Sequence, residues 1–204
     1  MGNLLKIGVL VSGSGSNLQS ILDACQSGEL KARVACVISN KADAFALERA
    51  RSAGIPALHL DHRAHAGREA YDEALVATLR EFRVELVAMA GFMRIITPVL
   101  LDAFPMAVMN IHPALLPSFP GLHAQRQAME YGAKIAGCTV HFVDPGTDTG
   151  PIIIQAAVPL LEGDTEETLS ARIQKEEHRI YPEAIRLFAD GRLKVTGRLV
   201  QVSS

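Results

Sequence analysis

The chain has 204 residues, of which 49% are hydrophobic and 21% are charged, and its formal net charge is -2. This composition predicts one globular domain, residues 1–204, rather than a disordered chain, and the net charge implies no polyanion partner. No apolar run is long enough to span a membrane, and Lys6 interrupts both a signal-peptide and a myristoylation pattern. We therefore expect a cytoplasmic protein without a nucleic-acid or membrane partner.

The three cysteines are far apart, and their odd number and spacing match no disulfide framework or zinc motif. They are Cys25, Cys36 and Cys138. We expect them to be small buried residues in a reducing compartment.

Short apolar runs alternate with helical periodicity through the first half of the chain. Strands are predicted at residues 5–13, 32–39, 56–60, 84–91 and 107–111. Helices are predicted at 17–28, 44–54, 68–82 and, as a short connection, 98–103. Because strands and helices alternate, we expect an α/β fold with a mostly parallel twisted sheet and helices on both faces.

The second half has a different pattern. A helix is predicted at 124–132, two β runs at 136–143 and 150–160, and a hairpin at 192–202. Asp164 is expected to cap a further helix, with Glu167 completing a capping box, and Pro182 is expected to kink or break that helix. The second half therefore predicts a mixed C-terminal part within the same domain.

A glycine-rich loop, VSGSGSNL at residues 11–18, joins the first predicted strand to the first predicted helix. Glycine lets the backbone turn tightly, and the free N–H groups at a helix start attract anions, so a phosphate is the expected ligand. A dinucleotide site is disfavoured, because Leu18 replaces a third glycine and the second strand ends in Ser39 and Asn40 rather than an acidic residue. A tight turn with polar helix caps and no ligand is the alternative.

The segment NIHPALLPSFPG, residues 110–121, places an amide and an imidazole where an apolar run ends. Asn110 and His112 are two positions apart on a strand, so they point to the same side. An amide N–H and an imidazolium can stabilise a developing oxyanion, and the histidine can also transfer a proton. The three prolines of the segment would hold this backbone still.

A carboxylate beside His112 would favour its protonated form and fix its tautomer. The segment DPGTDTGPI offers Asp144 and Asp148, and the residues alone do not choose between them. A metal site of His112, His123, His141 and Asp148 is a competing hypothesis, but their spacing matches no zinc pattern. A hydrogen-bonded histidine at a strand end is the structural alternative.

Six segments, in order along the chain, together resemble the glycinamide ribonucleotide formyltransferases. They are VSGSGSNLQSIL, ISNKADAFALERA, AGFMRIITP, NIHPALLPSFPGLHAQRQA, GCTVHFVDPGTDTGPIIIQ and QKEEHRIYP. The resemblance covers residue 6 to about residue 195. It implies the formyltransferase fold and an enzyme of purine synthesis without a metal. Such an enzyme passes the formyl group of 10-formyltetrahydrofolate to glycinamide ribonucleotide through a tetrahedral intermediate.

The resemblance also implies roles for individual residues. Asn110 would donate to the oxyanion, His112 would donate a proton, and Asp148 rather than Asp144 would be the catalytic aspartate. The implied nucleotide-binding residues are Gly15, Ser16, Asn17, Gln174 and Glu177. The implied folate-binding residues are Arg68, Met93, Arg94, Ile95, Ile96, Asn110, Asp144, Pro145, Gly146, Thr147 and Asp148.

Some of these assignments have alternatives. Met93 and Ile95 could be plain core residues, and Arg68 could be a surface charge. Gln125 stands where some relatives carry a histidine, which leaves its role in phosphate binding open. By the resemblance, residues 1–100 would form the nucleotide- and phosphate-binding half and residues 101–204 the catalytic and folate-loop half. We expect a monomer or a homodimer.

Four other functions are alternatives to this one. A methionyl-tRNA formyltransferase would need a basic C-terminal domain, and a 10-formyltetrahydrofolate hydrolase would need an N-terminal regulatory domain. A phosphosugar-binding module would tolerate loss of Asn110, His112 or Asp148, all of which are present. A nicotinamide-dependent dehydrogenase is disfavoured by Leu18 and by the end of the second strand.

Overall fold

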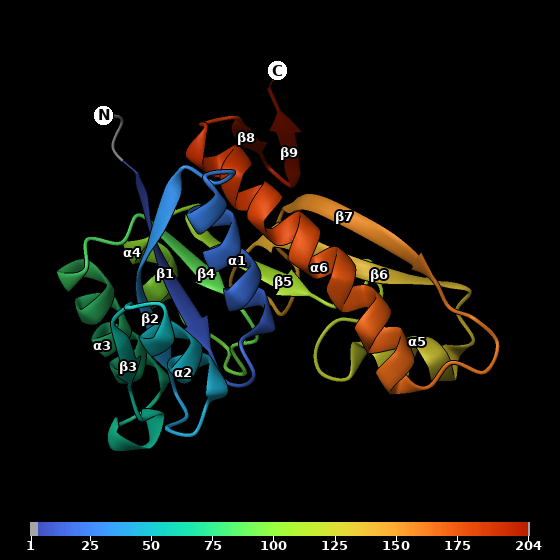
Figure 1. Cartoon of the computed structure of the whole chain (residues 1–204), viewed down its shortest axis with the longest axis horizontal. Helices are drawn as coiled ribbons and strands as arrows, with labels where there is room; N and C mark the ends of the chain where they lie inside the picture. The colour runs from blue at the N-terminus through green and yellow to red at the C-terminus, as the bar shows by residue number, and fades with distance from the viewer. Residues whose placement is uncertain (1–3, 204) are drawn as a thin grey trace. The chain divides into compact units, whose positions relative to one another are not determined.

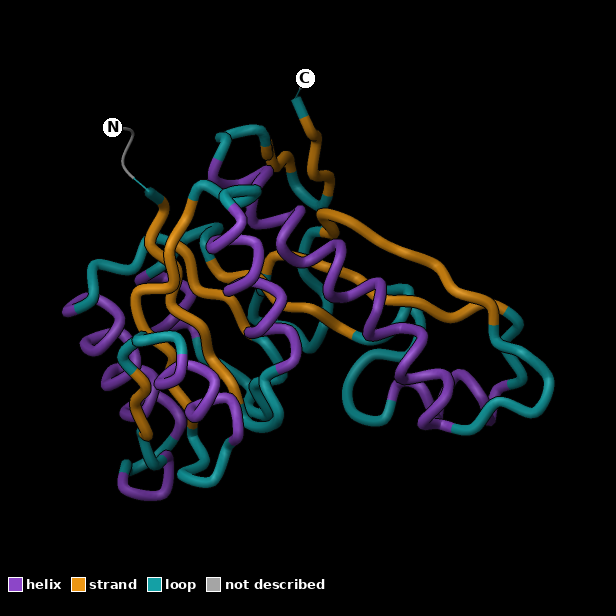
Figure 2. Tube along the Cα trace, viewed as in Figure 1, coloured by secondary structure: helices purple, strands orange, loops and turns teal. Residues whose placement is uncertain are grey.

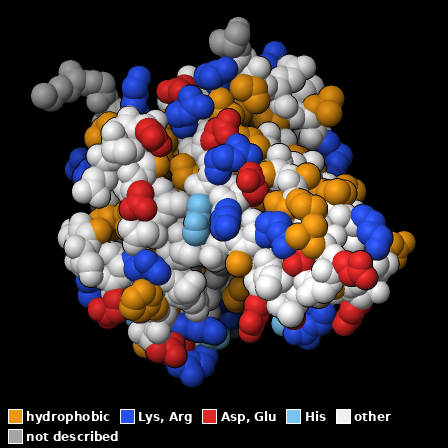
Figure 3. All heavy atoms as spheres, turned by 45° about the vertical axis from the view of Figure 1, so that its right-hand side comes forward, with side chains coloured by type: hydrophobic (Ala, Val, Ile, Leu, Met, Phe, Trp, Pro, Cys, Tyr) orange, Lys and Arg blue, Asp and Glu red, His pale blue; other side chains and the backbone are white. Residues whose placement is uncertain are grey.

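The computed structural model describes residues 4–203, and the chain divides into two compact units, residues 1–109 and residues 110–204. The strand β5 (Val108–His112) contains the boundary between them. Basic and acidic side chains are interspersed on the face drawn in Figure 3, in keeping with the small net charge.

The first unit is built from parallel β-strands joined by helices (Figure 1). Its strands are β1 (Leu5–Val11), β2 (Ala32–Ser39), β3 (Ala57–His59) and β4 (Leu86–Met89), in the order β3-β2-β1-β4. Every pairing among them is parallel. Its helices are α1 (Ser16–Ser27), α2 (Phe45–Ser52), α3 (Arg68–Glu81) and α4 (Pro98–Ala103), and a 3-10 turn, η1 (His62–Ala64), precedes α3. The apolar runs of β1, β2 and β4 are almost wholly buried, as expected for strands covered on both faces.

The second unit pairs two long antiparallel strands and covers them with a long helix (Figure 1). Its elements after β5 are α5 (Ala124–Tyr131), β6 (Ile135–Phe142), β7 (Ile152–Pro159), α6 (Glu166–Ala189), β8 (Leu193–Thr196) and β9 (Leu199–Val202). The helix α6 packs on β6 and β7 through a buried stripe that includes Leu169, Ile173 and Ile180. The strands β8 and β9 form the expected hairpin. The predicted class, an α/β fold with a mostly parallel sheet and a mixed C-terminal part, is confirmed.

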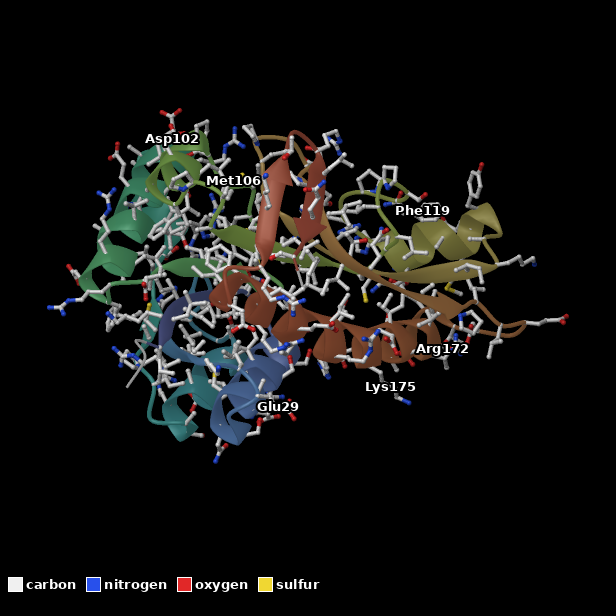
Figure 4. The ribbon with its side chains drawn as sticks, turned by 90° about the horizontal axis from the view of Figure 1, so that it is seen from above. Glu29, Asp102, Met106, Phe119, Arg172 and Lys175 are labelled. Carbon is white, nitrogen blue, oxygen red and sulfur yellow. The ribbon has the colours of Figure 1, made fainter. Side chains whose placement is uncertain are left out.

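The predicted start of α6 is wrong by one residue. Thr165, not Asp164, is the N-cap, and its reciprocal partner in the capping box is Thr168 rather than Glu167. Asp164 instead binds Arg172, which is labelled on α6 in Figure 4, and this guanidinium holds the pKa of the Asp164 carboxyl well below its usual range.

Pro182 does not break α6. The helix runs from Glu166 to Ala189 and is drawn as one continuous coil in Figure 2. A proline removes one hydrogen bond from a helix interior. Buried residues on both sides of it, from Leu169 to Leu187, hold the helix against the strands, and we attribute its continuity to this packing.

The cysteines are free thiols; Cys36 and Cys138 are buried, as expected, but Cys25 is only partly buried. Burial raises their pKa values to about 11 for Cys25 and about 12 for Cys36 and Cys138. They are therefore poor nucleophiles near neutral pH. Within residues 4–203, no helix is both long and apolar enough to cross a membrane.

Candidate active site

The structure brings the three predicted catalytic side chains together within the second unit. Asn110 and His112 lie on β5, and Asp148 lies in the loop between β6 and β7. The Nδ1 atom of His112 is 3.3 Å from Oδ2 of Asp148, and Nδ2 of Asn110 is 3.5 Å from Oδ1 of the same carboxylate. The His112 side chain is 5% exposed and that of Asp148 is 14% exposed, so the pair is largely shielded from water.

His112 has a hydrogen-bond acceptor at each ring nitrogen. Its Nε2 atom is 2.8 Å from the carbonyl oxygen of Phe119, a residue labelled in Figure 4 in the loop before α5. Its Nδ1 atom faces the Asp148 carboxylate. A neutral imidazole has one N–H and one lone pair, so it can satisfy only one of these acceptors. The ring satisfies both when it carries a proton on each nitrogen, which is the form of a proton donor.

Asp148 is held by its backbone and by a second donor. It has a left-handed φ of 53°, a conformation that aspartate adopts more readily than most residues but that is uncommon outside glycine. Its Oδ2 accepts a hydrogen bond from the backbone N–H of Gly121 at 2.8 Å. The same oxygen therefore joins the β6–β7 loop to the proline-rich segment that follows His112.

The Asp144 carboxylate accepts hydrogen bonds from its own loop. Its Oδ1 accepts from the backbone N–H of Gly146 at 3.1 Å and from the hydroxyl of Thr149 at 2.6 Å. Both donors belong to its own loop. The geometry thus favours Asp148 as the partner of His112, while Asp144 shapes the loop in which Pro145 and Thr147 are exposed.

His141 is a member of the site whose place the sequence did not reveal. Its Nδ1 is 2.8 Å from the Phe142 carbonyl oxygen, and its Nε2 is 3.3 Å from Nδ2 of Asn110 and 3.8 Å from Oδ1 of Asp148. Burial lowers the pKa of His141, and the Phe142 carbonyl and Asp148 oppose this shift. A neutral ring with its proton on Nδ1 accepts a hydrogen bond from Asn110 at Nε2. His141 therefore orients the Asn110 amide.

A buried hydroxyl holds the chain just after His112. The Oγ1 atom of Thr139 donates to the Ala114 carbonyl at 2.7 Å and accepts from the Leu116 N–H at 3.1 Å. The Gln155 amide adds bonds to the Leu116 carbonyl at 2.9 Å and to Oγ1 of Thr139 at 3.0 Å. Side chains of β6 and β7 thus fix the start of the proline-rich segment, as its composition led us to expect.

The glycine loop of the first unit has a structural reason for one of its glycines. Gly15 is the N-cap of α1 with φ 72°, and a Cβ there would lie 2.6 Å from the Cβ of Ala46. A Cβ at Gly13 would meet nothing within 4 Å. Ser16 and Asn17 form the first turn of α1. The loop therefore presents a helix N-terminus, and only at Gly15 does the fold itself demand glycine.

The predicted folate-binding residues of the first unit differ in exposure. Met93 is 63% exposed and Ile95 is 56% exposed, so neither is a core residue, whereas Ile96 is buried. Arg68 is exposed at the first position of α3, and the Arg94 guanidinium stacks on the ring of Tyr71. In the second unit, Gln174 is exposed on α6 and Glu177 is buried on the same helix.

No group of three or more histidine, cysteine or acidic side chains within residues 4–203 is arranged to hold a metal ion.

Comparisons with known proteins place these residues in a family context. A model of the formyl transferase family matches residues 5–185. The phosphoribosylglycinamide formyltransferase of Escherichia coli (strain K12) is 50% identical over 191 residues, which cover 94% of this chain and 90% of that protein. The trifunctional purine biosynthetic protein adenosine-3 of Drosophila pseudoobscura pseudoobscura is 49% identical over 191 residues, which cover 93% of this chain and 14% of that protein. The crystal structure of glycinamide ribonucleotide transformylase 1 from Symbiobacterium toebii matches with 60% identity and a TM-score of 0.99, covering 100% of this chain and 96% of that one.

Proposed function

Because the chain belongs to the formyl transferase family, we propose that it transfers the formyl group of 10-formyltetrahydrofolate to the amino group of glycinamide ribonucleotide. The family expected from the sequence is confirmed. The products are formylglycinamide ribonucleotide and tetrahydrofolate, and the step belongs to purine biosynthesis. The folate is a cosubstrate, and no metal takes part in the proposed step.

The observation that carries this proposal is the shared carboxylate of Asp148, with the His112 ring on one side and the Asn110 amide on the other. The substrate amine attacks the formyl carbon, and negative charge develops on the formyl oxygen. Asn110 and His112 donate to this oxyanion once a donor of each leaves the acceptor that it has in the structure, and each such donor typically contributes about 3 kcal/mol or more.

Collapse of the tetrahedral intermediate needs two proton movements. The attacking amine loses a proton, and Asp148 is the base that accepts it, through a water molecule. The bond between the formyl carbon and the folate nitrogen breaks, and that nitrogen takes a proton from His112. Asp148 stabilises the charge of the ring until it takes up the amine proton, and passing that proton on to His112 restores both groups.

Substrate binding is proposed residue by residue. In the first unit, the helix start at Gly15, Ser16 and Asn17 suits the phosphate of the nucleotide, because the N–H groups of a helix start and the helix dipole attract anions. In the second unit, Gln174 and Glu177 are proposed to contact the nucleotide, the glutamate through ribose hydroxyls. The folate contacts are proposed for the residues that the family resemblance indicated, and the oligomeric state and cytoplasmic location stay predictions.

The test is a formyl-transfer assay on the purified protein with 10-formyltetrahydrofolate, with and without glycinamide ribonucleotide. The proposal expects tetrahydrofolate to appear only when the nucleotide is present. Equal deformylation without the nucleotide would identify a hydrolase instead. A folded protein that gives no product in either reaction would refute formyl transfer to this acceptor.

A further inference from the structure

The loop after β4 carries exposed apolar side chains on a backbone that is fixed at both ends. We call residues 93–97 the donor segment, because the proposed function places folate, the formyl donor, against it. Met93 and Ile95 point to solvent, while the backbone N–H groups of Met93 and Thr97 both bind buried side chains. Exposed apolar side chains cost free energy in water unless a ligand or partner covers them. The fixed backbone therefore suggests that Met93 and Ile95 are held in place to contact a ligand.

The first attachment is at the start of the donor segment. The N–H of Met93 donates to Oγ of Ser12 at 2.9 Å, and the Ser12 hydroxyl donates to Oδ1 of Asn40 at 2.6 Å. Ser12 and Asn40 are 5% and 6% exposed and follow directly after β1 and β2. Because Asn40 uses the hydroxyl proton of Ser12, the lone pairs of Ser12 face the donor segment.

The second attachment is at the end of the donor segment. A single oxygen of Asp72, Oδ2, accepts from the Thr97 N–H at 2.6 Å and from the Thr97 hydroxyl at 2.8 Å. Asp72 is 2% exposed on α3. Burial raises the pKa of Asp72, and the two Thr97 donors oppose that shift. The carboxylate therefore satisfies two donors of Thr97, which is itself buried, and ties the end of the donor segment to α3.

A third contact lies between these two ends. The guanidinium of Arg94 stacks on the ring of Tyr71, with Cζ 5.2 Å from the ring centroid. Tyr71 is 1% exposed and immediately precedes Asp72 on α3. Neighbouring residues of one helix thus hold both the middle and the end of the donor segment.

We propose that Ser12 and Asp72 are positioning residues for folate binding, which hold the donor segment in the shape that presents Met93 and Ile95 to the folate. This inference rests on the proposed function. When only a fraction of molecules has the binding-competent loop, the apparent affinity falls by that fraction. Removal of one attachment is therefore expected to weaken folate binding and to leave nucleotide binding unchanged.

The experiment uses Ser12→Ala, which removes the first attachment, and Thr97→Val, which keeps side-chain shape and removes one donor to Asp72. Thr97→Ser restores that donor and is the rescue variant. Thr78→Val is the matched control, because its hydroxyl donates within α3 to the Ala74 carbonyl at 2.9 Å. Calorimetry measures the Kd for tetrahydrofolate, kinetics give KM for each substrate, and hydrogen exchange reports on residues 93–97.

We expect Ser12→Ala and Thr97→Val to raise the Kd for tetrahydrofolate and the KM for the formyl folate by roughly tenfold, with faster exchange in the donor segment. The nucleotide KM should change by less than about twofold, and Thr97→Ser and Thr78→Val should match the wild type. An unchanged folate Kd, or equal increases in both KM values, would overturn the inference and leave the proposed function standing. A wild-type protein that neither binds tetrahydrofolate nor forms product would overturn the proposed function itself, and this inference with it.

Discussion

Asp148→Asn tests most directly whether the Asp148 carboxylate supports proton transfer by His112. The asparagine has nearly the shape of the aspartate, and its oxygen can still accept from the Gly121 N–H. That oxygen position, Oδ2, also faces Nδ1 of His112, so the NH2 group lies at the Oδ1 position, beside Nδ2 of Asn110. The variant therefore removes the negative charge that faces the His112 ring and places two donors against each other at Asn110, and both changes weaken proton transfer to the leaving folate nitrogen.

The size of the effect follows from the distance and the burial of the pair. Two unit charges 3.3 Å apart attract by about 5 kcal/mol at an effective dielectric constant of about 20. Desolvation offsets part of this attraction, and loss of one partner of a buried pair typically costs about 3 to 5 kcal/mol. At about 1.4 kcal/mol per factor of ten, kcat is expected to fall by roughly 10²- to 10⁴-fold.

Single-turnover formyl transfer checks the prediction and should show the fall in rate. Asp144→Asn is the contrasting variant, because Asp144 accepts from Gly146 and Thr149 of its own loop, and it is expected to act on the folate KM rather than on kcat. A wild-type rate in Asp148→Asn would refute the reasoning.

Three further outcomes are expected. Gly15→Ala should destabilise the fold by about 2 kcal/mol or more, because Gly15 has a left-handed φ and an added Cβ would collide with Ala46. Gly13→Ala should keep the wild-type urea midpoint and weaken only nucleotide binding, because a Cβ there would meet nothing within 4 Å. The free energy of unfolding should fall as the pH drops below 6.5, the ordinary pKa of histidine. In that range the His141 ring takes up a proton in the unfolded chain, whereas burial lowers its pKa in the folded protein. Urea unfolding should show a flatter pH dependence in His141→Gln. Thr165→Ala should lower the unfolding free energy by about 1 kcal/mol, since it removes the acceptor for the Thr168 N–H, and an unchanged denaturation midpoint would contradict this.

The sequence predicted the elements well where the periodicity of apolar residues was strong. It failed at the start of α6, where Asp164 and Thr165 are adjacent residues of the N-cap type and the reciprocal bonds of Thr168 decide between them. It also failed at Pro182, because the contacts that hold α6 are tertiary and leave no local signal.

The site was only partly predictable for a related reason. The two-residue spacing placed Asn110 and His112 on one side of a strand, but the choice of Asp148 over Asp144 depends on a loop that turns through a left-handed residue. Asp144 and Asp148 have the same side chain, so residue type alone does not predict which of them lies at that turn. His141 gave no signal because seven of the eight residues of β6 are buried, so the strand lacks the alternation that marks a residue facing a site.

Two backbone carbonyls, of Phe119 and Phe142, lie at the two ends of the hydrogen-bonded side chains of the proposed active site. A carbonyl can only accept, so these two groups determine which neighbouring atoms donate. The Phe142 carbonyl requires the proton of His141 on Nδ1, which leaves Nε2 to accept from the Asn110 amide and turns the amide oxygen away from it. At the other end, the Phe119 carbonyl can only accept from Nε2 of His112, and Nδ1 of the same ring faces the Asp148 carboxylate. Asp148 is thus shared by Asn110, His112 and the Gly121 N–H. A change in its charge alters the first two contacts at once, so the effects of substitutions at Asn110 and His112 should not be additive with those at Asp148.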